Sequence, residues 1–229
     1  MSIFAGVEMP RVIHQTSSEF NGNIEVVEKN NVRKIFVDGH LQSVSANSQN
    51  IERMVWGKIA KLIKSENPDM RRAMILGLGG GTLQWLLATN FPHCHMTSVE
   101  IDPVMVDVAK NFFAIEQLQN HKIILDDACR VIASPEEFQI AQHSYDTLVV
   151  DIFQGERYPD LGTSGTFLSG IKNVVVPGGL VIFTRLYLDD HQHDTNMFIE
   201  TVEMYFSNIQ SLVVAGKTNS DHALIFGRA

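Results

Sequence analysis

Cysteine is scarce in this chain and long apolar runs are absent. Only Cys94 and Cys129 occur in 229 residues, too few for a disulfide framework, so we expect a reducing, cytoplasmic location. No apolar stretch approaches the roughly 18 residues that a membrane-spanning helix needs. Residues 1–10 lack the basic start and apolar core of a signal peptide. We therefore predict a protein without a membrane partner.

Basic residues are also few. Lys and Arg number 18 against 26 Asp and Glu, which gives a net charge of −8. Binding to phosphate backbones needs clustered Lys and Arg, so nucleic acid is excluded as the main partner. The negative charge would suit a cationic small substrate, but a charge of this size is better explained by solubility alone.

The N-terminal residues carry β-strand signals. The hydrophobic fraction of 45% is typical of a globular chain, and 229 residues suit one α/β domain with a small appendage. β-Branched residues within 24–37, around the turn Lys29-Asn30-Asn31, predict a β-hairpin. Asp38-Gly39 predicts a second turn, before a short strand at 41–44.

The main domain is predicted to span residues 48–229, after a small N-terminal β element at 1–47. It opens with an amphipathic helix near 48–65 and then alternates strands and helices. The predicted strands are 73–76, 96–100, 123–125, 147–151, 181–184, 212–215 and 223–226. This alternation predicts an α/β fold with a mostly parallel sheet covered on both faces, and the last two strands can form an antiparallel edge hairpin.

A glycine-rich turn, Gly77-Leu78-Gly79-Gly80-Gly81, directly follows the strand at 73–76. Glycine lets the backbone turn tightly and approach a ligand, and the next helix begins with free N–H groups. The turn does not match G-x-G-x-x-G, because that motif needs a glycine at Thr82. We predict that Gly77, Gly79, Gly80 and Gly81 cradle a nucleoside of the S-adenosylmethionine type; the alternative is a plain turn.

Acidic residues follow the next two strands. In such sheets ligands lie outside the carboxyl ends of the strands, and an acid about 20 residues after the glycines can bind ribose hydroxyls. Glu100 is the candidate for this contact, whereas Asp102 precedes Pro103 and is better explained as a helix cap. Asp127 either accepts a hydrogen bond from the adenine amine or caps the helix at Ala128, and the sequence leaves both open.

Asp151 ends the apolar strand at 147–151. A carboxylate at that strand end faces the predicted cleft and can act as a general base. The following segment, 152–165, is long enough to form a lid. An Asp at a strand end is often only a loop anchor, so the catalytic assignment depends on the other motifs.

One cluster contains residue types that bind metals. It consists of Asp189, Asp190, His191, His193 and Asp194. Their spacing matches no regular metal motif. A solvated turn followed by a helix cap explains the cluster better, so we expect no metal site.

Taken in order, these motifs resemble the spermidine synthase family of polyamine aminopropyltransferases. The resemblance extends from about Ile24 to Phe226. The matching segments are Asp38-Gly39-His40-Leu41-Gln42, the glycine turn, Glu100-Ile101-Asp102, Asp126-Asp127-Ala128, Asp151 and Pro177-Gly178-Gly179. The resemblance implies a Rossmann-like sheet of the S-adenosylmethionine-dependent methyltransferase type. It also implies an N-terminal β element that often helps to form dimers, so a homodimer is one expectation.

The resemblance implies roles for individual residues. Decarboxylated S-adenosylmethionine would be the co-substrate, with Glu100 binding its ribose and Asp127 its adenine. Asp151 matches the proposed base that deprotonates the attacking amine, and Gln42 matches a glutamine near the ligand. The implied acceptor is a small-molecule amine, and the implied process is polyamine biosynthesis.

Several positions depart from the family pattern. Gly80 stands where the family has an Asp that holds the cationic propylamine arm. Gln154 stands where a second Asp binds the polyamine, which makes Gln154 the candidate acceptor contact in this chain. Ile51 and Thr184 replace a tyrosine and a glutamine. These departures argue against ordinary spermidine synthesis.

Three functions are consistent with these residues. The first is an aminopropyltransferase-like enzyme with an altered amine acceptor. The second is a methyltransferase that uses intact S-adenosylmethionine, because the neutral Gly80 does not repel the carboxylate of that nucleoside. The third is a non-catalytic nucleoside-binding protein, which the lost acceptor contacts permit. The overall resemblance and the retained Asp151 favour the first.

Overall fold

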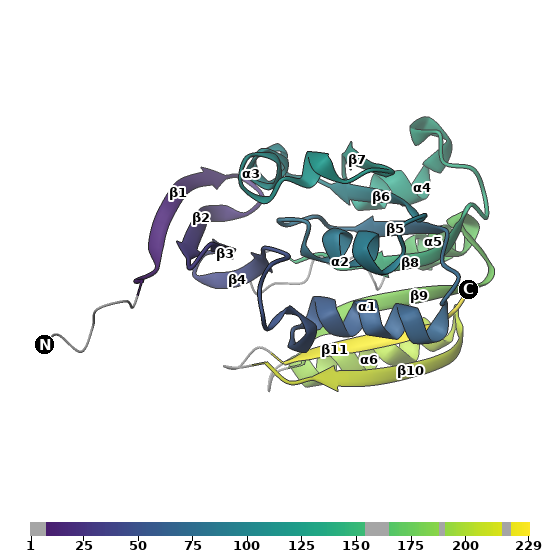
Figure 1. Ribbon diagram of the computed structural model, residues 1–229. Helices are drawn as coiled ribbons and strands as arrows, with labels where there is room; N and C mark the ends of the chain where they lie inside the picture. The colour runs from purple at the N-terminus through teal and green to yellow at the C-terminus, as the bar shows by residue number, and fades with distance from the viewer. Residues whose placement is uncertain (1–7, 154–164, 188–190, 217–220) are drawn as a thin grey trace, which may run out of the picture.

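The computed structural model describes residues 8–153, 165–187, 191–216 and 221–229. In this part of the chain, a small antiparallel sheet stands beside a larger sheet that helices cover on both faces (Figure 1). The α/β fold class predicted from the sequence is therefore confirmed, including the small N-terminal sheet.

The small sheet has four strands in chain order. They are β1 (Arg11–Ser18), β2 (Gly22–Lys29), β3 (Val32–Val37) and β4 (His40–Val44). The turn between β2 and β3 has positive φ at Asn30 (48°) and Asn31 (62°), as a tight hairpin requires. The predicted hairpin and the turn at Asp38-Gly39 are confirmed. Strand β1 was not predicted, because its residues are largely exposed or half-buried and give no clear apolar alternation.

The large sheet has the order β10-β11-β9-β8-β5-β6-β7. Its strands are β5 (Arg72–Leu76), β6 (His95–Glu100), β7 (His121–Leu125), β8 (Tyr145–Val150), β9 (Val175–Leu186), β10 (Ser207–Val214) and β11 (His222–Arg228). The neighbours from β7 to β9 are parallel, and β11 is antiparallel to both β9 and β10. The predicted antiparallel hairpin of the last two strands is confirmed, with β10 at the edge.

In the part of the chain that the structure describes, six α-helices cover the large sheet. They are α1 (Val55–Glu66), α2 (Thr82–Asn90), α3 (Pro103–Phe113), α4 (Ala128–Ala133), α5 (Gly165–Val174) and α6 (His191–Glu203). In Figure 1, α1 and α2 lie in front of the sheet, and α5 and α6 lie behind it. Within the described residues, no helix is both long and apolar enough to span a membrane.

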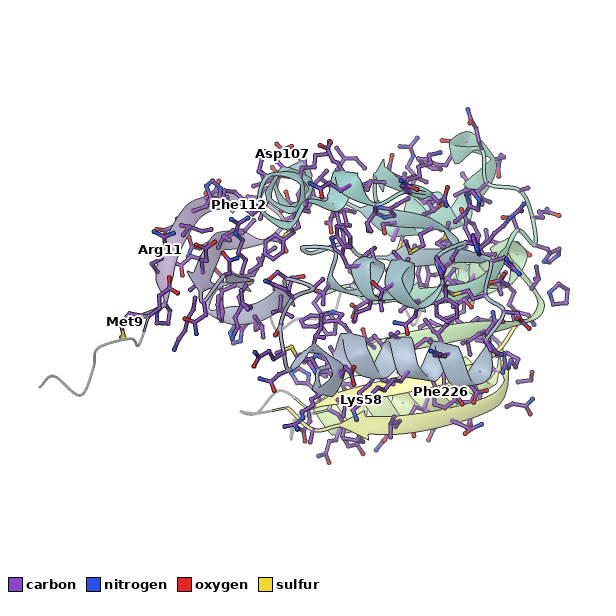
Figure 2. The ribbon with its side chains drawn as sticks, in the orientation of Figure 1. Met9, Arg11, Lys58, Asp107, Phe112 and Phe226 are labelled. Atoms are coloured by element: carbon purple, nitrogen blue, oxygen red, sulfur yellow. The ribbon has the colours of Figure 1, made fainter. Side chains whose placement is uncertain are left out.

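Helix α3 joins the two sheets. Val106 and Ala109 pack into the core of the large sheet, whereas Met105, Val108 and Phe113 pack on the small sheet. Figure 2 labels Phe112 at this junction, where its ring stacks on His14 of β1 with ring centroids 4.8 Å apart. The helix therefore fixes the small sheet beside the strand ends of the large one.

Two predicted helices differ from the structure. The helix expected near 48–65 begins only at Val55, because Met54 has an extended backbone that separates it from a single 3-10 turn at Ile51–Arg53. Helix α5 was missed, because the sequence analysis assigned the residues before Thr166 to a lid and predicted no helix after it.

Candidate active site

A cavity of about 850 Å³ opens at the carboxyl ends of β5, β6, β7 and β8. Its other walls come from the β3–β4 region, from the start of α1 and from the adjoining ends of β9, β10 and β11. Six of the residues predicted from the sequence line this cavity: Gln42, Gly77, Gly79, Glu100, Asp127 and Asp151. The volume falls within the range of roughly 300–1,000 Å³ that is usual for small-molecule sites.

At Gly77 the end of β5 lies close against the end of β8. Its φ of +106° is strained for any residue with a side chain. A Cβ at this position would overlap the carbonyl oxygen of Asp151. The amide of Asp151 donates to the carbonyl oxygen of Leu76 at 2.8 Å, which holds β5 and β8 together at this point. Glycine is therefore required here by the packing of the two strand ends.

Gly80 and Gly81 do not line the cavity. The amide of Gly80 donates to the Ser43 hydroxyl at 2.9 Å, and a Cβ on Gly80 would meet Phe113 at 3.0 Å. A Cβ on Gly81 would overlap Ile115. These two glycines bring the turn close to β4 and to the end of α3. Their position does not favour the prediction that they contact the nucleoside.

A pair of hydroxyls that the sequence analysis did not single out joins the small sheet to the glycine turn. Thr82 Oγ1 donates to the Val44 carbonyl at 2.7 Å and accepts from the Val44 amide at 3.0 Å. Ser43 Oγ lies 2.7 Å from Thr82 Oγ1, and both side chains are buried. These contacts place β4, and with it Gln42, in the wall of the cavity.

The Glu100 carboxylate lies at the end of β6 and is fixed by two backbone amides. Oε2 accepts from Leu78 at 3.1 Å, and Oε1 accepts from Asp102 at 3.0 Å. Burial raises the pKa of Glu100 above its ordinary value, although these hydrogen bonds oppose the shift. The carboxylate is therefore held rigidly against the glycine turn, facing the cavity.

The two Asp residues that were candidates for helix caps both act as caps. Asp102 accepts from the Val104 amide at 2.9 Å, as predicted. Asp127 accepts from the Cys129 amide at 2.8 Å through Oδ1 and caps α4. Because Asp127 is exposed and also lines the cavity, capping does not prevent it from contacting a ligand.

Asp151 lies at the end of β8 inside the cavity. Its Oδ1 accepts from Thr184 Oγ1 at 2.7 Å, and its Oδ2 accepts from Trp56 Nε1 at 3.2 Å. Burial raises the pKa of Asp151, while these two hydrogen bonds and the nearby His222 act in the opposite direction. A carboxylate with a raised pKa is better suited to accept a proton near neutral pH than an exposed one.

Trp56 and His222 belong to this site, and the sequence analysis did not single them out. Trp56 is in the first turn of α1, and His222 begins β11, where it pairs with Leu186 of β9. Neither residue is near Asp151 in sequence; the sheet order brings His222 to this site, and the packing of α1 brings Trp56. Gln154, the predicted acceptor contact, lies outside the described residues, as does most of the predicted lid.

The hydrogen-bond acceptors of the cavity fit a nucleoside such as S-adenosylmethionine or its decarboxylated form. Glu100 and Asp127 offer carboxylate oxygens at the ends of two adjacent strands. These oxygens can accept hydrogen bonds from the ribose hydroxyls and the adenine amine of such a ligand. The apolar residues Leu78, Ile101 and Met105 line the cavity and can contact a base and a ribose. Within the described residues, no three His, Cys, Asp or Glu side chains group as a metal site.

Comparison with known proteins identifies a family for this chain. The model described as the spermine/spermidine synthase domain matches residues 52–227. A polyamine aminopropyltransferase of Vibrio vulnificus is 32% identical over 132 residues, which cover 56% of this chain and 43% of that protein. The human eEF1A lysine and N-terminal methyltransferase is 30% identical over 144 residues, which cover 57% of this chain and 20% of that protein.

Solved structures share the fold. A probable spermidine synthase from Corynebacterium glutamicum superposes with a TM-score of 0.76 at 19% identity, covering 95% of this chain and 80% of that one. The chain spans less than half the length of both curated relatives described above.

Proposed function

Because the chain belongs to the spermine/spermidine synthase family, we propose that it transfers the aminopropyl group of decarboxylated S-adenosylmethionine to an amine acceptor. The observation that carries this proposal is the position of Asp151. Its carboxylate lies in the same cavity as Glu100 and Asp127, at the carboxyl end of β8, which pairs in parallel with β5. This position supports a role for Asp151 as a base next to the proposed nucleoside site.

The nucleoside would lie across the ends of β5, β6 and β7. In this arrangement Glu100 accepts from the ribose hydroxyls, and Asp127 accepts from the adenine amine through the carboxylate oxygen that does not cap α4. Gln42 approaches from the small sheet. The roles of these three residues are proposals, supported by their presence in one cavity and by the family resemblance.

Asp151 would handle the proton of the acceptor amine. The bound co-substrate supplies an electrophilic methylene next to its sulfonium, so the C–S bond pair leaves with sulfur as the new C–N bond forms. Asp151 takes one proton from the amine nitrogen, which frees the lone pair that forms this bond. The Thr184 and Trp56 hydrogen bonds hold the carboxylate in place during this transfer.

Methyl transfer from intact S-adenosylmethionine is the second candidate. Two observations favour it. Gly80 provides no carboxylate at the turn, and the matched human relative carries a methyltransferase name. The same base would serve both reactions, because each needs a neutral nitrogen nucleophile.

A homodimer, a cytoplasmic location and a small-molecule acceptor remain predictions for either enzyme.

Titration calorimetry with the two nucleosides separates the candidates. We expect tighter binding of decarboxylated S-adenosylmethionine, together with release of methylthioadenosine when an amine panel is added. Clear preference for the intact nucleoside and release of S-adenosylhomocysteine would instead establish methyl transfer. Asp151→Asn should retain nucleoside binding and lose turnover by at least about 100-fold, as expected for a general base; unchanged turnover would exclude its proposed role.

A further inference from the structure

Gln84 contributes a buried amide to the wall of the cavity. It lies in the first turn of α2, lines the cavity and is 1% exposed. Its Nε2 donates to the Gly77 carbonyl oxygen at 3.3 Å and to Ser98 Oγ at 2.9 Å. The reverse orientation of the amide would place Oε1 against the Gly77 carbonyl oxygen, and two acceptors cannot pair. These contacts therefore fix the orientation of the amide.

The carbonyl oxygen of this amide is its unpartnered end. Oε1 is buried, and it accepts no hydrogen bond from the described residues. Next to Ser98, two buried apolar side chains line the cavity: Ile75, its partner across the sheet, and Val99, which follows it. All these residues belong to the continuous stretch 8–153 that the structure describes. A buried acceptor without a donor is costly and uncommon, so a donor group that enters the cavity would be favoured at this point.

Gly77, whose carbonyl oxygen holds the Gln84 amide, lies between two strand ends. Its own amide donates to the Val99 carbonyl oxygen of β6 at 2.8 Å, and a Cβ on it would overlap the Asp151 carbonyl oxygen after β8. In the proposed arrangement the ribose lies on Glu100 at the end of β6, and the reacting amine lies at Asp151. The sulfonium arm of the nucleoside would therefore pass over Gly77, next to the Gln84 amide.

We propose that Gln84 Oε1 accepts a hydrogen bond from the ammonium group at the end of this arm. The proposal rests on the proposed function, which puts the nucleoside across these strand ends. An ammonium group carries three N–H donors and no acceptor, so it needs several oxygens around it. Gln84 Oε1 and the second lone pair of the Gly77 carbonyl oxygen supply two of them. Intact and decarboxylated S-adenosylmethionine both carry this ammonium, so the contact serves either candidate reaction.

The test uses two thioether nucleosides, which have no sulfonium and cannot transfer their arm. Aminopropylthioadenosine carries the ammonium, and in butylthioadenosine a methyl group takes its place. Calorimetry on the intact wild-type chain should show at least tenfold tighter binding of the amine, because hydrogen bonds from a charged donor are strong. Equal binding of the two nucleosides would overturn the inference without touching the proposed function. Binding of neither would refute the proposed function itself, and the inference with it.

Two variants of Gln84 test whether the preference comes from its amide oxygen. Gln84→Met removes the acceptor and keeps the length of the side chain, so it should lower the ratio of the two affinities about tenfold and leave butylthioadenosine binding unchanged. Gln84→Glu keeps an oxygen acceptor in the same shape and should keep at least the wild-type ratio. A wild-type ratio in Gln84→Met, or an equal loss of both nucleosides, would mean that Gln84 only supports the glycine turn. If Gln84→Met does not fold, a ratio in Gln84→Glu below that of the wild type overturns the inference.

Discussion

Gly77 lies directly against the main-chain carbonyl of Asp151, so that the first residue of the glycine turn and the candidate base share one contact. A side chain at Gly77 would push the end of β8 away and would also strain its own backbone, at φ +106°. We expect Gly77→Ala to lower the free energy of unfolding by more than about 3 kcal/mol. Nucleoside affinity should fall with it, as measured by urea unfolding and calorimetry.

Gly178→Ala is the control for backbone strain alone. Gly178 also has positive φ (78°), but no atom lies within 4 Å of a Cβ built there. Gly178→Ala should lower the free energy of unfolding by about 1–2 kcal/mol and leave nucleoside affinity unchanged. Equal effects of the two variants would show that the Asp151 contact is unimportant.

Asp151→Asn is expected to separate stability from activity. Burial raises the pKa of Asp151, so the fold favours its protonated form and the ionised carboxylate opposes folding at neutral pH. Asn can accept from Trp56 and donate to Thr184, whose hydroxyl can turn to the Val150 carbonyl at 3.2 Å. At pH 7 the melting temperature of the variant should therefore equal or exceed that of the wild type. The expected increase is about 2–4 °C for each kcal/mol gained in the free energy of unfolding.

The pH dependence of this difference has a definite sign. As pH falls through the raised pKa of Asp151, the wild-type carboxyl takes up its proton in the folded state and the opposing contribution disappears. The advantage of the Asn variant should shrink in calorimetric melts as pH is lowered from 7 towards the ordinary Asp pKa of about 4. Wild-type turnover should decline over the same range, because the base is lost. A variant clearly less stable than wild type at pH 7 would contradict this account.

Local sequence patterns predicted the strand ends of the site well. Glu100, Asp127 and Asp151 each follow an apolar strand, and parallel strands bring such ends to one edge of the sheet. Trp56 and His222 could not be found in this way. Trp56 reaches Asp151 from a helix 95 residues earlier, and His222 reaches the cavity because β11 pairs with β9. Such contacts depend on tertiary packing, which the periodic pattern of apolar residues within one segment does not reveal.

The turn at Gly80 shows a second limit of sequence reasoning. A glycine-rich motif indicates that the backbone needs space, but it does not say on which side. Gly77 needs this space for Asp151, whereas Gly80 and Gly81 need it for the small sheet and for Ile115. The docking of β4 through Thr82 therefore decides which glycines border the cavity.

His121 should make the protein sensitive to mild acid. Its ring lies 2.9 Å from Ser98 Oγ, which accepts from Gln84 Nε2, and burial lowers the pKa of His121 to about 4. The unfolded chain takes up a proton near pH 6.5, so stability is lost as pH falls from there towards 4. At pH 5 this loss should be about 2 kcal/mol.

His121→Gln should remove that part of the acid sensitivity. Urea unfolding at pH 7.5 and at pH 5 gives, for each protein, the change in the free energy of unfolding between the two pH values. The exposed His93, changed to Gln, is the control and should keep the wild-type difference. If the free energy of unfolding changes with pH by the same amount in both variants, the acid sensitivity comes from groups other than His121.

Asp102 connects the two sheets and should be a major source of stability. It is fully buried, caps α3, and accepts from Ser18 Oγ at 2.5 Å and from Asn21 Nδ2 at 2.6 Å. Asp102→Asn would place an amide against these two donors and leave buried groups unsatisfied. We expect a loss of about 2–4 kcal/mol in the free energy of unfolding. Because Asn21 lines the cavity, nucleoside affinity should also fall.

A double-mutant cycle tests the connection through Ser18 directly. Ser18→Ala and Asp102→Asn should be coupled by about 1 kcal/mol or more, because each removes the same hydrogen bond. Asp107→Asn is the matched control on the same helix: Asp107 is exposed, as Figure 2 shows, and its change should stay within about 0.5 kcal/mol. Additive effects of the Ser18 and Asp102 variants would mean that the hydrogen bond between these two side chains does not help to hold the two sheets together.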